Sequence, residues 1–384
     1  MSMPDSVRRP RARLRKRRDF EGEALFHKGL GLGNGGIMGA APMPFRRSDR
    51  HPLADTDASK RNLAQDIEMP TAPRIVQHPQ DVVDLRDWAL EDNPFGLQGN
   101  QPKRIFICPD PPPHNFLIGG HRYLFKEPAG WRSKQIWSEV IAYELSRDLL
   151  IPVPPAFLAL GPGNGAPGVL IEFMYDHPGD EPSRYVDAIE LLQGAGFQTN
   201  ERRGSLLDNI SLSRSLAVPR AREWWARTIA FDAVIGNTDR HSRNWGTLVT
   251  LRPNAAHYRL APAFDNGTSL GYGITEAKLL SKTQPEEIAK LVAGGCHHYG
   301  WLAGDRATAQ HAALCAEMKR RVRGGIGDAM DAAQDLSDHR IEAIAQWCTT
   351  FPFPDPFSDA RADFVIAQLK ARRTALQAAL RNVP

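Results

Sequence analysis

The chain has 384 residues, 42% of them hydrophobic, and a formal net charge of only +4. This length allows two domains or one two-lobed domain with a sizeable core, and no apolar run is long enough to span a membrane. The four cysteines form no Cys-x-x-Cys pair, which counts against a zinc site or a disulfide framework, and no secretory signal is evident, so we expect a cytoplasmic protein.

The first part of the chain, Met1–Gln80, is predicted to be mostly disordered because it is low in sequence complexity. Arg8–Arg18 (RRPRARLRKRR) favours a solvated tail, and an arm that binds nucleic acid or an anionic membrane is the alternative. Gly29–Gly39 contains Gly-x-Gly spacings, but no strand precedes it and no helical pattern follows, so it is not expected to bind phosphate. Ordered structure is expected to begin near Asp81.

The next elements mix strands and helices. Val82–Leu90 is predicted as a short helix, and Arg104–Cys108 as an apolar strand. Arg122–Lys126 (RYLFK) is predicted as a strand that ends at Lys126. Ser133–Leu150 carries apolar residues at helical spacing and is predicted to be an amphipathic helix.

A hairpin and further helices are expected in the middle of the chain. Ala156–Leu160 and Val169–Phe173 are predicted to pair across a glycine-rich turn. Tyr185–Gly194 and Ala221–Ile235 are predicted as helices, and the adjacent tryptophans of the second helix are expected in the core.

The remainder of the chain is predicted to be mainly helical. Trp245–Val249 and Leu260–Phe264 are the two apolar segments that we expect to be strands. The predicted helices that follow are Thr283–Val292, Gln310–Arg323, Ser337–Thr349 and Asp359–Arg381.

Two polar clusters interrupt these apolar segments. The first, in Phe231–Gly246, contains Asp239 and Asn244 in the order Asp-x-x-x-x-Asn, and the second is Asp-Asn-Gly beginning at Asp265. In a kinase catalytic loop, an Asp in this order takes the proton of the acceptor hydroxyl and the Asn holds Mg²⁺, while a later Asp is the second metal ligand. Carboxylate and amide oxygens suit Mg²⁺, whose remaining ligands are phosphate oxygens and water.

Each cluster alone is typical of an ordinary turn, because Asn, Asp and Gly are common turn residues. The pair in this order, with apolar flanks, favours the catalytic interpretation. Two upstream residues support it: Lys126 ends a predicted strand, where a kinase lysine pairs with the nucleotide phosphates, and Glu139 lies on the following helix, where it can pair with that lysine. Glu144 is the rival on the same helix and is expected to face solvent.

The motifs Gly-Asn-Thr-Asp-Arg-His-Ser-Arg-Asn-Trp and Leu-Ala-Pro-Ala-Phe-Asp-Asn-Gly resemble those of the HipA-like kinases of bacteria. The resemblance covers Asp84 to the C-terminus and is most specific over Ala226–Gly271. Both motifs are also similar to those of phosphatidylinositol kinases, and the Asp-Asn-Gly in particular is similar to that of the type II phosphatidylinositol 4-kinases. The resemblance implies an α+β, two-lobed kinase fold, with a small β-rich lobe and hinge over residues 81–176 and a mostly helical lobe over residues 177–384.

The same resemblance implies ATP and Mg²⁺ as cofactors and assigns further residues. Gly99–Lys103 is similar to the short phosphate-side loop of HipA-like kinases, with a surface turn as the alternative, so Lys103 is a candidate for phosphate contact. Leu170–Asp176 would be the hinge, where backbone groups of Glu172 and Met174 read adenine and Asp176 reaches the ribose. Arg243 is expected either to contact the γ-phosphate or to be exposed, and His241 to have a structural role in the loop.

Three functions stay open. The first is a HipA-like kinase that phosphorylates Ser or Thr of a protein, with an antitoxin-like regulator as a partner. The second is a kinase for a phosphatidylinositol-type lipid or a small molecule. The third is a pseudokinase or a nucleic-acid-binding module that uses the arginine-rich arm.

Overall fold

In the computed structural model, the structure describes residues 76–91, 103–197, 204–253, 255–322, 326–381 and 383. The predicted disorder of residues 1–75, the arginine-rich run, the glycine-rich run and residues 99–102 of the predicted phosphate-side loop therefore lie outside the described residues. Of the helices described, none combines the length and apolar character that crossing a bilayer requires.

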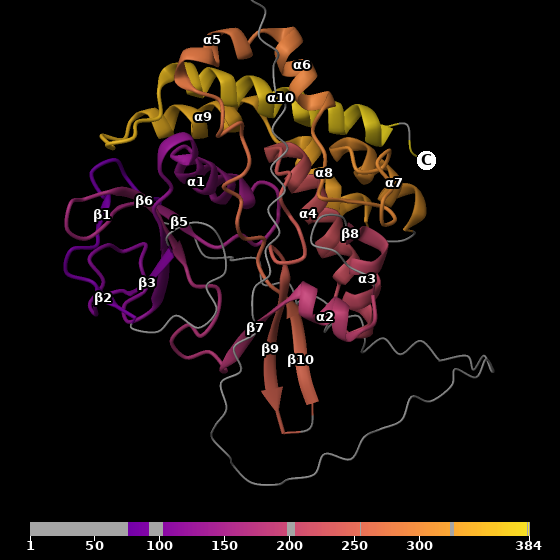
Figure 1. Cartoon of the computed structure of the whole chain (residues 1–384), viewed down its shortest axis with the longest axis horizontal. Coiled ribbons are helices and arrows are strands. Elements are labelled where there is room, and N and C mark those ends of the chain that lie inside the picture. Colours follow the sequence, from indigo (N-terminus) through magenta and orange to yellow (C-terminus); the bar gives the residue numbers. More distant parts are fainter. Residues whose placement is uncertain are drawn as a thin grey trace, which may run out of the picture. The chain divides into compact units, whose positions relative to one another are not determined.

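A six-stranded sheet occupies the first part of the described chain (Figure 1), in the order β1-β5-β6-β4-β3-β2. The β1–β5 pairing is parallel, whereas the other neighbours are antiparallel. The strands are β1 (Val83–Asp84), β2 (Ala89–Leu90), β3 (Lys103–Ile107), β4 (Arg122–Lys126), β5 (Ala156–Leu160) and β6 (Pro167–Glu172).

The two edge strands of this sheet correct one prediction. Val82–Leu90 is not a helix but forms β1 and β2, joined by a turn in which Asp84 accepts a hydrogen bond from the Arg86 backbone N–H at 3.0 Å. Val83 and Leu85 are both fully buried, which is the two-residue period of a strand. With so few residues between turns, the pattern does not distinguish a strand from a helix.

The described structure includes ordered residues before Asp81, where ordered structure was expected to begin. Gln77 is 2% exposed, and its amide forms hydrogen bonds with both backbone groups of Leu158 on β5, at 2.9 Å to the carbonyl and 2.8 Å from the N–H. The side chain thus satisfies backbone groups of β5 in the way that a neighbouring strand does.

Helix α1 (Gln135–Ser146) packs against β5 and β6, as its apolar stripe predicted. The expectation that Glu144 faces solvent is wrong, because this side chain is buried and its Oε2 lies 3.7 Å from the Arg340 guanidinium. Arg340 comes from a distant helix, and its position next to α1 depends on tertiary packing, which helical periodicity does not contain.

The remaining helices form the second part of the described chain. Helix α10 packs against α4, α6, α7 and α9 (Figure 1). Trp224 and Trp225 of α4 are both buried, as predicted. The helices are α2 (Ala188–Gly194), α3 (Leu206–Ser215), α4 (Ala221–Ile235), α5 (Leu279–Lys282), α6 (Pro285–Ala293), α7 (His311–Arg321), α8 (Gly327–Asp335), α9 (Asp338–Thr349) and α10 (Asp359–Arg381), with 3₁₀ turns η1 (Gly130–Arg132) and η2 (Glu276–Lys278).

Two smaller sheets complete the described fold. One has the order β10-β9-β7, from β7 (Ser183–Asp187), β9 (Gly246–Arg252) and β10 (Ala255–Leu260), and the other pairs β8 (Gly204–Ser205) with β11 (Tyr299–Gly300).

The three-stranded sheet corrects two further predictions. The first residues of the predicted helix Tyr185–Gly194 belong to β7, and residues 261–264 are not a strand, because β10 ends at Leu260. At Gly246 a Cβ would lie 2.3 Å from the Val186 carbonyl oxygen, so only glycine permits β9 to approach β7 this closely.

This hairpin positions the two polar clusters. Residues 236–245 connect α4 to β9, and Asp265 follows β10. Because Leu260 pairs with Thr247, the end of β10 lies beside the start of β9. The pairing therefore brings the segment with Asp239 next to the segment with Asp265.

Candidate functional site

The Lys126 ammonium lies at the centre of the site. Its Nζ is 2.7 Å from Glu139 Oε1 and 2.7 Å from Asp265 Oδ1. The three residues come from the end of β4, from α1 and from the segment after β10, and the lysine is only 6% exposed. The predicted pair Lys126–Glu139 is therefore present, and Asp265 joins it.

The charges of this cluster stabilise one another. Burial alone would lower the pKa of Lys126, but attraction to Asp265 and Glu139 outweighs it and raises the pKa above its usual value. Burial alone would raise the pKa of Asp265, but the positive charges of Lys126 and Lys103 hold it well below its usual range. Lys126 and Asp265 are thus both charged at neutral pH, and the Asp265 side chain is 34% exposed.

The backbone at Asp265 has an unusual conformation that fits a functional position. Its φ is +58°, in the left-handed region that residues other than glycine seldom adopt. Two contacts hold the segment: Asp265 accepts a hydrogen bond from Lys126, and the Asn266 N–H donates to Glu139 Oε2 at 3.0 Å. Glu139 therefore binds both Lys126 and the Asp-Asn-Gly backbone.

The Asp239–Asn244 loop is held by its own side chains. Asn244 Nδ2 donates to the Asp239 carbonyl at 2.7 Å, and Asn237 Oδ1 accepts from the Asp239 N–H at 3.0 Å. The Asp239 carboxylate is 44% exposed and lies 3.9 Å from His241 Nε2. Burial raises the pKa of Asp239 from its usual value, and the nearby charge of His241 opposes the rise. His241 also accepts a hydrogen bond from the Arg243 backbone N–H at 3.2 Å, in agreement with its predicted structural role.

Arg240 is the main site residue that the sequence reasoning missed. It is 1% exposed and forms two hydrogen bonds to the carboxylate of Asp232, at 2.7 and 3.1 Å. It also donates to Asn266 Oδ1 at 2.7 Å and to the Phe264 carbonyl. Arg240 thus connects α4, the Asp239 loop and the Asp-Asn-Gly segment. The Asp-Arg-His order was a signal for this residue, but an arginine in a polar loop gives no indication that it is buried.

Lys103 and Arg243 lie in different surroundings. Lys103 pairs with Lys126 in the β3–β4 register, and burial lowers its pKa while the charge of Asp265 opposes this. Lys103 therefore lies close to the central cluster. Arg243 is half-buried. Burial raises the pKa of Asp187 at the end of β7, and the positive charge of Arg243 opposes this rise.

The predicted hinge residues form contacts of their own. Asp176 accepts hydrogen bonds from Arg122 Nη2 at 2.7 Å and from the Ser183 N–H at 3.0 Å, and Met174 is half-buried. The side chain of Glu172 binds His177, with 3.0 Å between Oε1 and Nε2.

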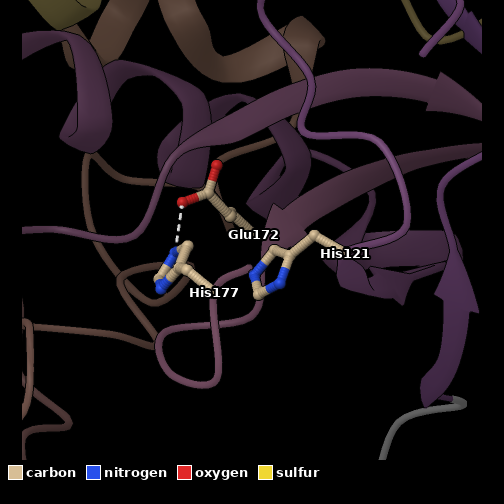
Figure 2. A group of neighbouring side chains, drawn as sticks. All are labelled: His121, Glu172 and His177. Carbon is tan, nitrogen blue, oxygen red and sulfur yellow. Dashed lines mark hydrogen bonds and ion pairs between the residues drawn. The ribbon is translucent and has the colours of Figure 1, made fainter. Parts of the chain in front are cut away.

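Figure 2 shows this Glu172–His177 pair with His121 beside it. The three side chains offer ligand atoms within 4.8 Å of one another, so we asked whether they could hold a metal ion. The two imidazole rings are stacked, with centroids 4.3 Å apart and planes inclined by only 17°. Imidazole lone pairs lie in the ring plane, so two nearly parallel rings cannot direct them at one ion. His121 Nε2 is also 2.8 Å from the Phe173 carbonyl oxygen. This arrangement fits a hydrogen-bonded charge pair rather than a metal centre.

The pair predicts a histidine with a raised pKa. The hydrogen bond that His177 donates to Glu172 raises the pKa of His177 above its usual value, with a smaller contribution from Asp180. This contact therefore stabilises the folded chain fully below about pH 6.5, the usual pKa of histidine, and the stabilisation is lost as the pH rises through the higher folded-state pKa. An NMR titration of His177 should show this raised pKa, and Glu172→Gln should lower it more than Asp180→Asn does. An unchanged pKa in Glu172→Gln would contradict the assignment.

Taken together, the sequence-predicted residues fall into two groups. The structure brings Lys103, Lys126, Glu139 and Asp265 into one cluster, and it places the Asp239–Asn244 loop beside that cluster through Arg240. The remaining candidates, which engage separate partners, are Glu172, Asp176 and Arg243.

Comparisons with known proteins place this site in context. The chain is similar to the Helicobacter pylori proinflammatory kinase CtkA, with 15% identity and a TM-score of 0.57 over 78% of this chain and 98% of that one. At this identity the likeness shows a shared kinase fold and nothing further. The chain is also similar to HipA in the Shewanella oneidensis MR-1 HipA–HipB–operator DNA complex (15% identity, TM-score 0.44, 76% of this chain and 65% of that one). A third match is the Golgi casein kinase (12% identity, TM-score 0.35, 86% of this chain and 76% of that one). A search of curated proteins found no match.

The family model for the HipA-like C-terminal domain matches residues 95–335, which contain the Lys126 cluster and the Asp239 loop. The matched region is more than half of the chain, and the predicted α+β, two-lobed kinase fold is confirmed. The chain therefore belongs to the family of proteins with a HipA-like C-terminal domain.

Proposed function

We propose that this chain is an ATP- and Mg²⁺-dependent phosphotransferase that transfers the γ-phosphate to the hydroxyl of a Ser or Thr side chain in a protein. The observation that carries the proposal is the Lys126 ammonium held between Glu139 and Asp265, both at 2.7 Å. Phosphoryl transfer requires mainly positioned charge around the phosphates, and such a cluster supplies it.

The donors near Asp265 suit a magnesium ion. Asp265 offers a partly exposed carboxylate, and Asn244 donates through its Nδ2, which leaves the amide oxygen as a ligand. Hard oxygen ligands of this kind are those that Mg²⁺ prefers. When bound, the ion would neutralise phosphate charge.

Side chains of the protein would bind the phosphates and accept the proton. Lys126, oriented by Glu139, would bind the nucleotide phosphates, and Lys103 would add a second positive charge. Asp239 would accept the proton of the acceptor hydroxyl. In this proposal Arg243 contacts the γ-phosphate.

At the hinge, backbone groups rather than side chains would recognise adenine. Because the Glu172 carboxylate binds His177, only backbone groups of Glu172 and Met174 would read adenine. Asp176 would reach the ribose beside its contact with Arg122.

Incubation with labelled ATP and Mg²⁺, alone and with cell lysate, tests the proposal. Wild type should transfer label to protein serine or threonine, whereas Asp265→Ala or a chelator should remove the transfer. The matched control is Asp363→Ala, which removes an exposed carboxylate on α10 and should retain full activity. Equal label transfer by wild type and Asp265→Ala would refute the enzyme assignment.

The Asp-Asn-Gly motif also supports a second candidate, a phosphatidylinositol-type lipid or small-molecule kinase. The same assay with phosphatidylinositol vesicles distinguishes the two. Label in the lipid fraction with none in protein would favour this second candidate. An antitoxin-like partner stays a prediction from the family resemblance.

A further inference from the structure

A cavity of about 180 Å³ lies between α4, α6, α7 and α10, away from the Lys126 cluster. Most of its lining is small and apolar, including Ala233, Val292 and Ala375. Its polar lining residues are Gln310, His311 and Arg372. An apolar cavity with a few convergent polar groups is the usual form of a small-molecule site.

Arg372 is a buried cation in the wall of this cavity. It is 5% exposed, and among the described residues no carboxylate forms an ion pair with it. Within the described part of the chain its Nε has no hydrogen-bond partner, and burial lowers the pKa of this guanidinium to about 10. A buried charge of this kind is costly unless an anion pairs with it.

His311 does not supply that anion. Arg372 Nη1 lies 3.1 Å from His311 Nδ1, which must therefore accept the hydrogen bond. The proton then sits on Nε2, which donates to the Asn237 carbonyl at 2.9 Å. Burial also holds the pKa of His311 well below its usual value, so the ring is neutral. Among the described residues that line the cavity, Arg372 thus carries the single formal positive charge.

The first turn of α7 adds a partial positive charge. Ala312 and Ala313 of this turn line the cavity, and Gln310 does not cap the helix with its side chain. Instead, the Gln310 amide donates to the Ala293 carbonyl at 3.1 Å. The His311 N–H donates to the Gly295 carbonyl at 3.2 Å, and the N–H groups of the next residues in the turn, which have no partner within the helix, favour an anion.

We propose that this cavity binds a small monocarboxylate with a short apolar body, whose carboxylate pairs with Arg372 and the first turn of α7. A dianionic phosphate fits less well, because the lining is mainly apolar and carries one formal charge. A water molecule occupies roughly 30 Å³ in the liquid, so the cavity volume corresponds to about six water molecules. This volume suits an acid of the size of butyrate.

The site is connected to the Asp239 loop by direct contacts. A Cβ on Gly236 would lie 2.5 Å from Arg372 Cζ, so the guanidinium packs against the backbone at the start of that loop. His311 binds Asn237, which in turn orients the Asp239 N–H. Binding of a carboxylate should therefore alter the loop, whatever reaction the chain catalyses.

Thermal unfolding and calorimetry of the full chain with sodium butyrate test the proposal, against sodium chloride at equal ionic strength and against sodium phosphate. Butyrate should raise the melting temperature saturably, because it binds the folded state. Arg372→Gln should raise the butyrate Kd at least about tenfold, since hydrogen bonds between charged groups contribute that much.

Two further variants keep the test independent of folding defects. Ala375→Leu retains Arg372 but fills the cavity, so it should abolish binding while the chain stays folded. Arg381→Gln removes an exposed arginine from the same helix and should bind butyrate like wild type.

Three results would overturn the proposal: no saturable butyrate effect in wild type, unchanged butyrate binding in both Arg372→Gln and Ala375→Leu, or Arg372-dependent binding of phosphate in place of butyrate. In addition, amide NMR resonances of Asn237 and Asp239 should shift on saturation with butyrate in wild type. These readouts do not depend on the proposed phosphotransfer.

Discussion

Asp239→Asn is expected to lower the turnover number by about 10²–10⁴-fold while the affinity for Mg²⁺–ATP stays near that of wild type. Asn244, Lys126 and Asp265, which we propose to bind the nucleotide and its metal, are unchanged in this variant. The lost group is the carboxylate that we propose takes the acceptor proton. Initial rates with saturating acceptor, together with calorimetric titration of ATP, separate the two effects.

The companion variants should show the opposite pattern. Asn244→Ala and Asp265→Asn are expected to lose productive Mg²⁺–ATP binding, because each removes a proposed metal ligand. If Asp239→Asn keeps most of the activity, the proton-acceptor role is wrong, even if the chain proves to be a kinase.

The raised pKa of Asp239 adds a pH signature. Burial raises this pKa, and the carboxylate must be deprotonated to accept a proton. Activity should therefore fall as the pH drops through the raised pKa, and this acid limb should be absent from the residual activity of Asp239→Asn.

Arg240→Met is expected to destabilise the folded chain by about 3–5 kcal/mol, the usual cost of removing one partner of a buried ion pair. The substitution leaves the Asp232 carboxylate, which is fully buried, without its two hydrogen bonds from the guanidinium. It also removes the donor to Asn266 Oδ1. The free energy of unfolding, measured by urea denaturation, should show this loss.

An exposed ion pair provides the matched control for Arg240. Arg252 lies 2.8 Å from Glu181, and both side chains are more than half exposed, so Arg252→Ala should cost less than about 1 kcal/mol. The double variant Arg240→Met/Asp232→Leu should recover much of the loss, because no uncompensated charge remains. If Arg240→Met costs no more than Arg252→Ala, this ion pair does not hold the loop.

Several elements could be predicted from sequence because their signal is local. The strand Arg122–Lys126 and the helices Ala221–Ile235 and Asp359–Arg381 have the predicted bounds. In the two helices, the period of apolar residues runs long enough to distinguish a helix from a strand. Val82–Leu90 and Tyr185–Asp187 were assigned wrongly, because short strands depend on partners that are distant in the chain.

The residues of the candidate site also divide into those that the sequence indicates and those that only tertiary contacts reveal. The order of chemical groups along the chain is enough to group Lys126, Glu139 and Asp265 as one set, and their contacts agree with this grouping. Tertiary contacts alone show that Arg240 is buried against Asp232, and that Arg372 lies beside a cavity where no carboxylate of the described residues pairs with it. The physical reason is that burial and charge pairing are properties of groups that meet from distant segments, whereas periodicity and motif order are properties of neighbours in the chain.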